Sequence, residues 1–542
     1  MKQHRRDRRS EKVAPLWADA ICINQKNKTE LNSLLLLVGQ IYTKAATVYV
    51  SLGDVGLYWH SALSLLHRLC LVREMEEKAG QHQQQRRTPG EVHEFYGFPS
   101  MDHAAWNNFW YTFTAPWFTR TWIVQEIALA NKAEVRFGPF SFRWISFLEA
   151  YVLASEIDRT VGGFKIRQGM LNVDKLLRIL RFRKSDVRLT LLLHILIFTR
   201  DFQVSDPRDK IIAVLGLADP KPAKYQTVTF EPNYAISVET LYHRFAIYQV
   251  DTFCVTSILS LAGLQRRSSA LGEMPSWVPD WTAQDPQIAS MDLSRIRPVG
   301  YEATGDSVSW NLLCRPHPEA DPDVLVMEGD CIDTIVALTP ALGIDRNGCR
   351  PQYRSEVDGV KRFLRWHCAA EVLMNQSNLK TLLSITYDDP EEAFARTLLV
   401  DDTYTGGNAL DTSRPIADPK LSHQIAMICL LAVEHGIGLI EKHTPTAQAT
   451  FHMQVLTACE GHRFAITKRG YIALVPHCAQ VGDRIALFLG TSVPFVLRES
   501  NRCSLTHGKV FFRLVGDAYV HGIMDGEAME FENFAPQEIW LC

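Results

Sequence analysis

Apolar positions near the start of the chain follow two different periods, which predict strand and helix in turn. Residues 14–24 predict a short strand that runs into a polar loop. Thr29 opens an apolar helix that ends near Ala45, and residues 47–53 form a β-branched strand that a glycine ends. This β–α–β order predicts a parallel sheet and therefore an α/β domain over residues 1–146.

Residues 54–105 interrupt this pattern with a glutamine-rich polar stretch and a Thr-Pro-Gly turn. They predict an insertion loop within the first domain. Helical character returns after Pro116. Trp122, Glu126 and Leu129 share one face of that helix, because they are spaced at i, i+4 and i+7.

The rest of the chain predicts a mainly helical middle region at 147–290, a mixed helix and strand region at 291–450 and a β-rich C-terminal module at 451–542. Within the helical region, Asp206-Pro207-Arg208-Asp209 predicts a helix start, with Asp206 as cap and Asp209 at the positive helix end. Two prolines bracket residues 275–281 and exclude a regular element there.

Short strands about ten residues apart predict a small antiparallel barrel or sandwich at the end of the chain. The predicted strands are 463–467, 470–475, 483–490, 496–498, 510–515 and 519–520. Upstream, residues 324–328 predict a further strand, and residues 355–445 predict helices and loops.

Composition and charge describe a globular chain. Hydrophobic residues make up 46% of its 542 residues, and 57 basic residues face 60 acidic ones. The net charge of −3 argues against a nucleic-acid partner or an anionic membrane surface. The longest apolar run, residues 425–433, is shorter than a membrane span, and no signal peptide pattern follows Met1. The 12 cysteines form no C-x-x-C pair, so reduced, mostly buried thiols and a cytoplasmic location are expected.

Two long motifs resemble the fungal heterokaryon incompatibility (HET) domain. They are LWADAICINQ at residues 16–25 and PWFTRTWIVQEIALA at residues 116–130. Segments at 206–210, 275–281 and 519–527 resemble those that accompany this domain. The family's usual first β–α unit, around a SYVWG-like block, is not found before Trp17, so the sheet is expected to be incomplete.

The resemblance implies a role in fungal self/non-self recognition that ends in programmed cell death. Allelic or non-allelic incompatibility factors, or further copies of the chain, would be the partners. It also implies a fold similar to Toll/interleukin-1 receptor (TIR) domains, with a flavodoxin-like parallel sheet. Some TIR relatives cleave NAD at the nicotinamide–ribose bond with a glutamate on a helix after a tryptophan-containing segment. The matching residue here is Glu126.

Glu126 is therefore the candidate catalytic residue, in a cleft lined by Trp117 and Trp122. A carboxylate there would orient the ribose hydroxyls and stabilise an oxocarbenium-like transition state. The alternative is a helix-surface glutamate paired with Arg120 or Lys132.

The loop after the first predicted strand supplies further candidates. Asp19 lies at the carboxyl end of that strand, where open α/β sheets bind ligands; the alternative is a carboxylate that caps the following turn. Asn24 and Gln25 either hydrogen-bond a ligand amide or stabilise the loop. Cys22 is expected to be a small buried residue rather than a nucleophile.

Arg120 either binds a phosphate or forms an ion pair with an acid such as Glu126. Arg208 and Asp209 are expected to be architectural. No glycine-rich nucleotide fingerprint and no histidine pair at metal-ligand spacing is present, so NAD enters only as a candidate substrate.

Three hypotheses follow. The first is a signalling protein that acts through protein association, and the second is an NAD-cleaving enzyme that uses Glu126. The third is an inert family member. The second requires Glu126 and Asp19 to meet in one cleft.

Overall fold

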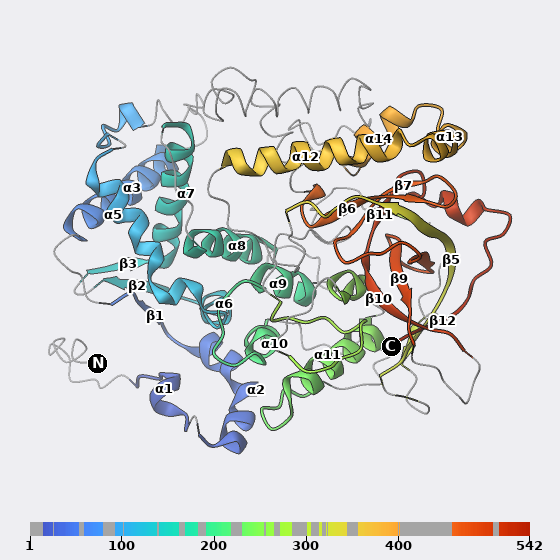
Figure 1. Cartoon of the computed structure of the whole chain (residues 1–542). Helices are drawn as coiled ribbons and strands as arrows, with labels where there is room; N and C mark the ends of the chain where they lie inside the picture. Colours follow the sequence, from blue (N-terminus) through green and yellow to red (C-terminus); the bar gives the residue numbers. More distant parts are fainter. Residues whose placement is uncertain are drawn as a thin grey trace, which may run out of the picture. The chain divides into compact units, whose positions relative to one another are not determined.

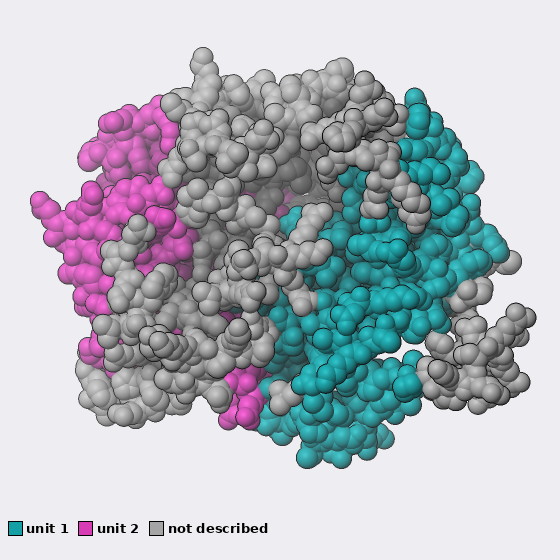
Figure 2. Space-filling view, turned by 180° about the vertical axis from the view of Figure 1, so that it is seen from behind, with its two compact units in different colours: residues 1–221, 232–237 teal, residues 222–231, 238–542 magenta. Residues whose placement is uncertain are grey.

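The computed structural model of the 542-residue chain divides it into two compact units (Figures 1 and 2). The first comprises Met1–Lys221 and Pro232–Ser237, and the second comprises Pro222–Glu231 and Val238–Cys542. The structure describes residues 15–24, 26–53, 59–79, 93–100, 102–137, 140–161, 168–182, 191–217, 230–253, 256–264, 271–283, 301–304, 314–316, 321, 323–343, 356–398, 400, 458–501 and 509–542.

The first unit contains a three-stranded sheet of order β1-β2-β3. Its strands are β1 (Val48–Ser51), β2 (Ala133–Phe137) and β3 (Phe140–Arg143). β1 and β2 are parallel, whereas β2 and β3 are antiparallel. The prediction of an α/β region at the N-terminus is confirmed, and the parallel partner of β1 is β2 rather than residues 14–24.

Residues 14–24 were expected to form a strand, and this expectation is wrong. Asp19–Cys22 form a single helical turn, α1, in which the Ala18 carbonyl accepts the amides of Ile21 and Cys22. The turn satisfies these backbone groups locally, so it needs no neighbouring strand. Cys22 is exposed rather than buried, because the short turn contributes no buried residue.

Helix α2 (Lys28–Lys44) confirms the first predicted helix. The Asn27 side chain caps it by accepting the amides of Thr29 and Glu30 at 3.1 and 3.2 Å. Lys44 lies in the last turn, where a cation favours the negative helix end.

The predicted insertion loop at 54–105 is instead largely helical. Residues Trp59–Ala79 form α3, and its buried residues, listed together, are Ala62, Leu63, Leu65, Leu66, Leu69, Cys70 and Val72. The prediction of a loop is wrong for Trp59–Ala79. It was based on the polar stretch at 81–87, which lies outside the described residues. Helices α5 (Ala104–Tyr111) and α7 (Trp144–Val161) pack against α3.

The helix predicted after Pro116 is divided in two. Pro116–Thr119 form the 3-10 helix η4, and Ile123–Ala128 form α6. Between them the Thr121 amide donates to the carbonyl of Gln203 at 3.0 Å, which ties this bend to the chain before α10 (Asp209–Leu215). Helices α8 (Gln168–Phe182) and α9 (Leu191–Thr199) complete the first unit and confirm helical structure there.

Gln125 connects three of these helices. With its amide oriented to satisfy both bonds, it donates to the carbonyl of Ala213 on α10 at 2.9 Å and accepts from the amide of Gly39 on α2 at 3.1 Å. A Cβ atom at Gly216 would lie 2.2 Å from the end of the Gln125 side-chain amide. Small residues on α2 and after α10 therefore permit the close approach to α6.

The second unit is built on a nine-stranded sheet that closes on itself. Its strands are β4 (Cys314–Pro316), β5 (Leu325–Leu338), β6 (His462–Thr467), β7 (Ile472–Pro476), β8 (Arg484–Phe488), β9 (Phe495–Glu499), β10 (Phe511–Asp517), β11 (Tyr519–Val520) and β12 (Gln537–Leu541). The order is β11-β7-β6-β5-β12-β10-β9-β8, and β8 also pairs with β5. The β-rich C-terminal module is thus confirmed, while β12 was not predicted.

Helices and one irregular segment accompany the sheet in this unit. Among the described residues, the α-helices are α11 (Val238–Phe253), α12 (Glu356–Met374), α13 (Ser377–Thr386) and α14 (Pro390–Leu398), and the 3-10 helices are η5 (Thr256–Leu261) and η7 (Glu527–Glu530). Residues 275–281 are irregular as predicted, and their Trp277 and Trp281 are buried. No helix in the described part of the chain is both long and apolar enough to cross a bilayer.

Candidate functional site

A pocket of about 300 Å³ lies within the first unit, beside α2. It is lined by Trp17, Asp19, Ile23, Lys28, Leu31, Leu34, Leu35, Val38, Tyr42, Trp122, Glu126, Ser205, Asp206, Arg208, Asp209 and Tyr234. Three predicted site residues, Asp19, Trp122 and Glu126, therefore meet in one cavity. Its walls combine aromatic rings with carboxylates, and the leucines of α2 form an apolar floor.

Glu126 is half-buried in the wall that α6 supplies. Its Oε2 accepts a hydrogen bond from the indole nitrogen of Trp117 at 3.2 Å. Burial raises the pKa of Glu126, while the Arg120 charge and the Trp117 hydrogen bond lower it. The alternative partner Lys132 instead contacts Glu134 at 2.9 Å. Glu126 is thus a carboxylate whose charged form is poorly solvated.

Trp117 reaches Glu126 without being among the pocket-lining residues. Its ring packs edge-on against Trp144, with the centroids 5.6 Å apart. Trp117 was expected to line the cleft together with Trp122; it instead donates a hydrogen bond to Glu126 from outside the pocket lining.

Tyr42 is a pocket residue that the sequence reading did not single out. Its ring contacts Trp17 edge-on, with the centroids 5.7 Å apart. Burial raises the pKa of Tyr42, and the charges of Glu126 and Asp19 raise it further. The phenol therefore stays neutral and lies within electrostatic reach of both carboxylates.

Asp19 lines the pocket, whereas Arg120 is not among its lining residues but contacts Asp19. An Asp19 carboxylate oxygen is 4.0 Å from the Arg120 guanidinium, and both side chains are about half exposed. The other Asp19 oxygen accepts the Ala20 amide at 2.7 Å. Such an exposed pair contributes little to stability. Arg120 pairs with an acid, as one alternative held, but the contact is with Asp19.

Asn24 is not among the residues that line the pocket. The Asn24 side-chain oxygen accepts the Lys26 backbone amide at 3.1 Å, and the Asn24 backbone amide donates to the Glu30 carboxylate at 3.1 Å. These bonds correspond to the loop-stabilising alternative. Gln25 lies outside the described residues.

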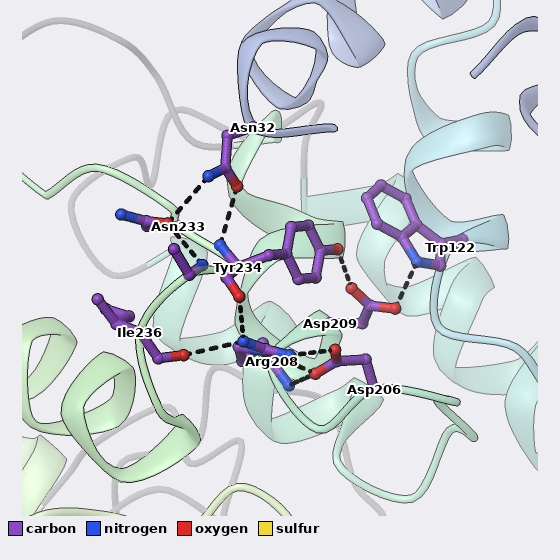
Figure 3. A network of polar contacts seen from close by, with 9 residues as sticks. Asn32, Trp122, Asp206, Arg208, Asp209, Asn233, Tyr234 and Ile236 are labelled. Atoms are coloured by element: carbon purple, nitrogen blue, oxygen red, sulfur yellow. Dashed lines mark hydrogen bonds and ion pairs between the residues drawn. The ribbon is translucent and has the colours of Figure 1, made fainter. Parts of the chain in front are cut away.

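Another part of the pocket lining is a hydrogen-bond network around Asp209 (Figure 3). The Trp122 indole donates to Asp209 Oδ2 at 3.1 Å, and the Tyr234 hydroxyl donates to Oδ1. Burial raises the pKa of Asp209, and these two hydrogen bonds oppose that rise. Trp122 thus joins the first turn of α10 to the helix that carries Glu126.

Arg208 joins the residues around the start of α10 to residues 234–236. It donates to both carboxylate oxygens of Asp206 at 2.9 and 2.7 Å, and to the carbonyls of Tyr234 and Ile236 at 2.5 and 2.8 Å. Asp206 was predicted to cap the helix. Its Oδ1 accepts the backbone amide of Arg208 at 3.0 Å and so caps the turn that leads into α10, while α10 itself, which begins at Asp209, has no side-chain cap bond. The expectation that Arg208 and Asp209 are architectural agrees with these contacts.

Asn32 on α2 and Tyr234 had no local signal in the sequence, because their contact joins residues about 200 positions apart. The Asn32 side chain accepts the Tyr234 amide at 2.8 Å and donates to Asn233 at 2.9 Å. Within the described ranges, no group of three or more His, Cys, Asp or Glu side chains is arranged to hold a metal ion.

Comparison with known families identifies both ends of the chain. Residues 1–126 match the family model "Heterokaryon incompatibility protein (HET)", and residues 434–536 match the "Het-6 beta-barrel domain". The pocket residues up to Glu126 lie in the first match, and strands β6 to β11 lie in the second. Both ends of the chain are therefore similar to heterokaryon incompatibility (HET) proteins.

One curated relative extends the similarity over most of the chain. It is "Heterokaryon incompatibility protein 6, OR allele" of Neurospora crassa, 25% identical over 589 aligned positions that cover 96% of this chain and 82% of the relative. No solved structure matches the chain.

Proposed function

We propose that the chain acts in fungal self/non-self recognition and triggers programmed cell death through protein association. Two domain matches and a Neurospora relative named for heterokaryon incompatibility support this role. The partners would be allelic or non-allelic incompatibility factors and further copies of the chain.

Controlled expression in a filamentous fungus tests this role. Inducing the intact chain with a non-self factor should reduce hyphal viability, and differently tagged copies of interacting partners should co-precipitate. An Asp209→Ala variant should lose the response, because it opens the buried network, while Glu156→Ala, an exposed pair with Arg73, should keep it. Unchanged viability and no association across incompatible pairings would refute the role.

As a second function we propose that the α/β unit, interpreted as TIR-like, binds and cleaves NAD. The observation that favours it is the meeting of Glu126 and Asp19 in one aromatic-lined pocket. A volume of about 300 Å³ is at the small end of ligand pockets, which suits the nicotinamide–ribose half, with the rest of NAD outside.

The chemistry would be hydrolysis of the N-glycosidic bond. Water attacks C1′ of the ribose as the bond to nicotinamide breaks, and that bond's electron pair neutralises the departing pyridinium. ADP-ribose, nicotinamide and a proton result. Glu126 would accept hydrogen bonds from the ribose hydroxyls and stabilise the cationic transition state. Trp17 and Trp122 would offer ring faces to the nicotinamide.

Nicotinamide release from NAD tests this activity. Purified chain, alone and artificially clustered, is compared with Glu126→Gln and with the matched control Glu156→Gln in the same unit. Release that Glu126→Gln abolishes and Glu156→Gln retains would support the proposal. No release from folded, clustered protein would refute it and leave signalling by association.

A further inference from the structure

Residues 232–237 form a short segment that leaves the second unit and returns to the first. The residues on either side, 222–231 and 238–542, belong to the second unit. The segment therefore lies in the first unit because its own contacts hold it there. We refer to residues 232–237 as the strap.

The side chains of Asn32, Arg208 and Asp209 in the first unit hold the strap (Figure 3). Asn32 binds its backbone at Tyr234 and its side chain at Asn233, at 2.8 and 2.9 Å. Arg208 binds the carbonyls of Tyr234 and Ile236, and its guanidinium lies 5.2 Å from the Tyr234 ring centroid. Most of the donor capacity of Arg208 is thereby used within the protein.

Tyr234 is the point where the strap meets the pocket. It is 6% exposed, lines the cavity and donates its hydroxyl to Asp209. The same Asp209 carboxylate binds Trp122, which is one helical turn before Glu126. A ligand that fills the pocket therefore contacts the strap and the groups that hold it.

The strap continues directly into the second unit, because Val238 is the first residue of α11. This helix is anchored there through side chains with no exposed surface, among them Leu241, Tyr242 and Phe245. Glu239, in its first turn, also accepts the Gly272 amide at 2.9 Å. A change in the strap thus acts through the covalent chain on a buried helix.

We propose that the strap couples occupancy of the pocket to the start of α11. A ligand in the pocket stabilises the hydrogen bonds that Tyr234 makes and thereby the first turns of α11. Loss of these hydrogen bonds destabilises the same turns. Only the identity of the ligand, a nicotinamide nucleotide, rests on the proposed function. Such coupling would let the α/β unit and the barrel unit act as one signalling protein.

Hydrogen exchange of the intact chain tests the coupling without a ligand. Asn32→Ala removes two hydrogen bonds to the strap and keeps a good helix former in α2. Exchange should become roughly tenfold faster in residues 232–237 and in the first two turns of α11. The matched control Asn24→Ala, which loses one exposed loop bond, should change neither.

Tyr234→Phe provides a second variant, since it removes the bond to Asp209 and keeps the ring. Faster exchange in both the strap and the start of α11 supports the coupling. Faster exchange in the strap with α11 unchanged in both variants overturns it, as does an unchanged strap.

A ligand arm uses nicotinamide mononucleotide. Slower exchange in residues 17–42 and 122–126 reports binding, and the proposal expects residues 234–243 to slow as well. Protection of the pocket without residues 234–243 would overturn the strap proposal and leave the proposed NAD binding intact. If neither region is protected, NAD binding fails and the Asn32→Ala and Tyr234→Phe results alone decide the coupling.

Discussion

Glu126 in the α/β unit and Asp483 in the barrel unit are both acids at the edge of an apolar core, but they are bonded very differently. Asp483 is 4% exposed, and Arg498 binds both of its carboxylate oxygens at 2.8 Å. The Gln480 amide adds a third bond at 2.8 Å. Among the described residues, a single hydrogen-bond donor, Trp117, reaches the Glu126 carboxylate.

The difference distinguishes an acid with a structural role, Asp483, from an acid that can still bind a ligand, Glu126. Three donors leave Asp483 little acceptor capacity, and its bond raises the pKa of Arg498, as expected of a pair that stabilises the charged forms. Glu126 faces a cavity with a raised pKa and unused acceptor capacity. A carboxylate that lies in a pocket, has a raised pKa and accepts few hydrogen bonds is a candidate for ligand binding.

The largest effect is expected from breaking the barrel pair. Arg498→Met should reduce the free energy of unfolding by about 3–5 kcal/mol, because it leaves the buried Asp483 charge uncompensated. Urea denaturation measures this. The control Arg484→Met removes an exposed pair with Glu499 and should cost about 1 kcal/mol or less. Equal losses in the two variants would contradict the structural role of Asp483.

A smaller loss is expected at the Asp209 corner. Trp122→Phe removes one donor from a buried carboxylate and should cost about 1–3 kcal/mol. The indole nitrogen of Trp144 has no hydrogen-bond partner in the described part of the chain, so Trp144→Phe tests ring size alone. If both variants lose the same stability in thermal unfolding, the Trp122 hydrogen bond contributes nothing.

The smallest effect has the opposite sign. Because the pKa of Glu126 is raised in the folded state, folding favours its protonated form, and stability falls as pH rises from the unfolded pKa through the folded one. Glu126→Gln should therefore be slightly more stable than the wild type at pH 7, with the gain lost near pH 4. The melting temperature measured across this range checks it. A destabilised variant at pH 7 would make Glu126 a structural acid like Asp483.

The sequence predicted those helices and strands whose signals lie within a few neighbouring residues. Helix α2 combines an Asn27 cap with an apolar stripe, and strands β8 and β10 are short apolar runs that follow one another at regular spacing. The single turn α1 was predicted as a strand, and the strand β12 was not predicted.

The candidate site was predictable only on its N-terminal side. Glu126, Asp19 and Trp122 belong to the two motifs at residues 16–25 and 116–130, and all three line the pocket. Tyr234 and Asn32 were not predicted, because contacts between residues about 200 positions apart follow from tertiary packing. The TIR-like arrangement of the sheet stays a prediction.

The long strand β5 has a consequence for how the second unit folds. It pairs with β4, β6, β8 and β12, whose residues extend from 314 to 541. Bringing such distant segments to one strand carries a large loop-closure entropy before the contacts are gained. We therefore expect the barrel to fold slowly, with β5 exposed until its last partner arrives, and newly made chains to depend on chaperones during that interval.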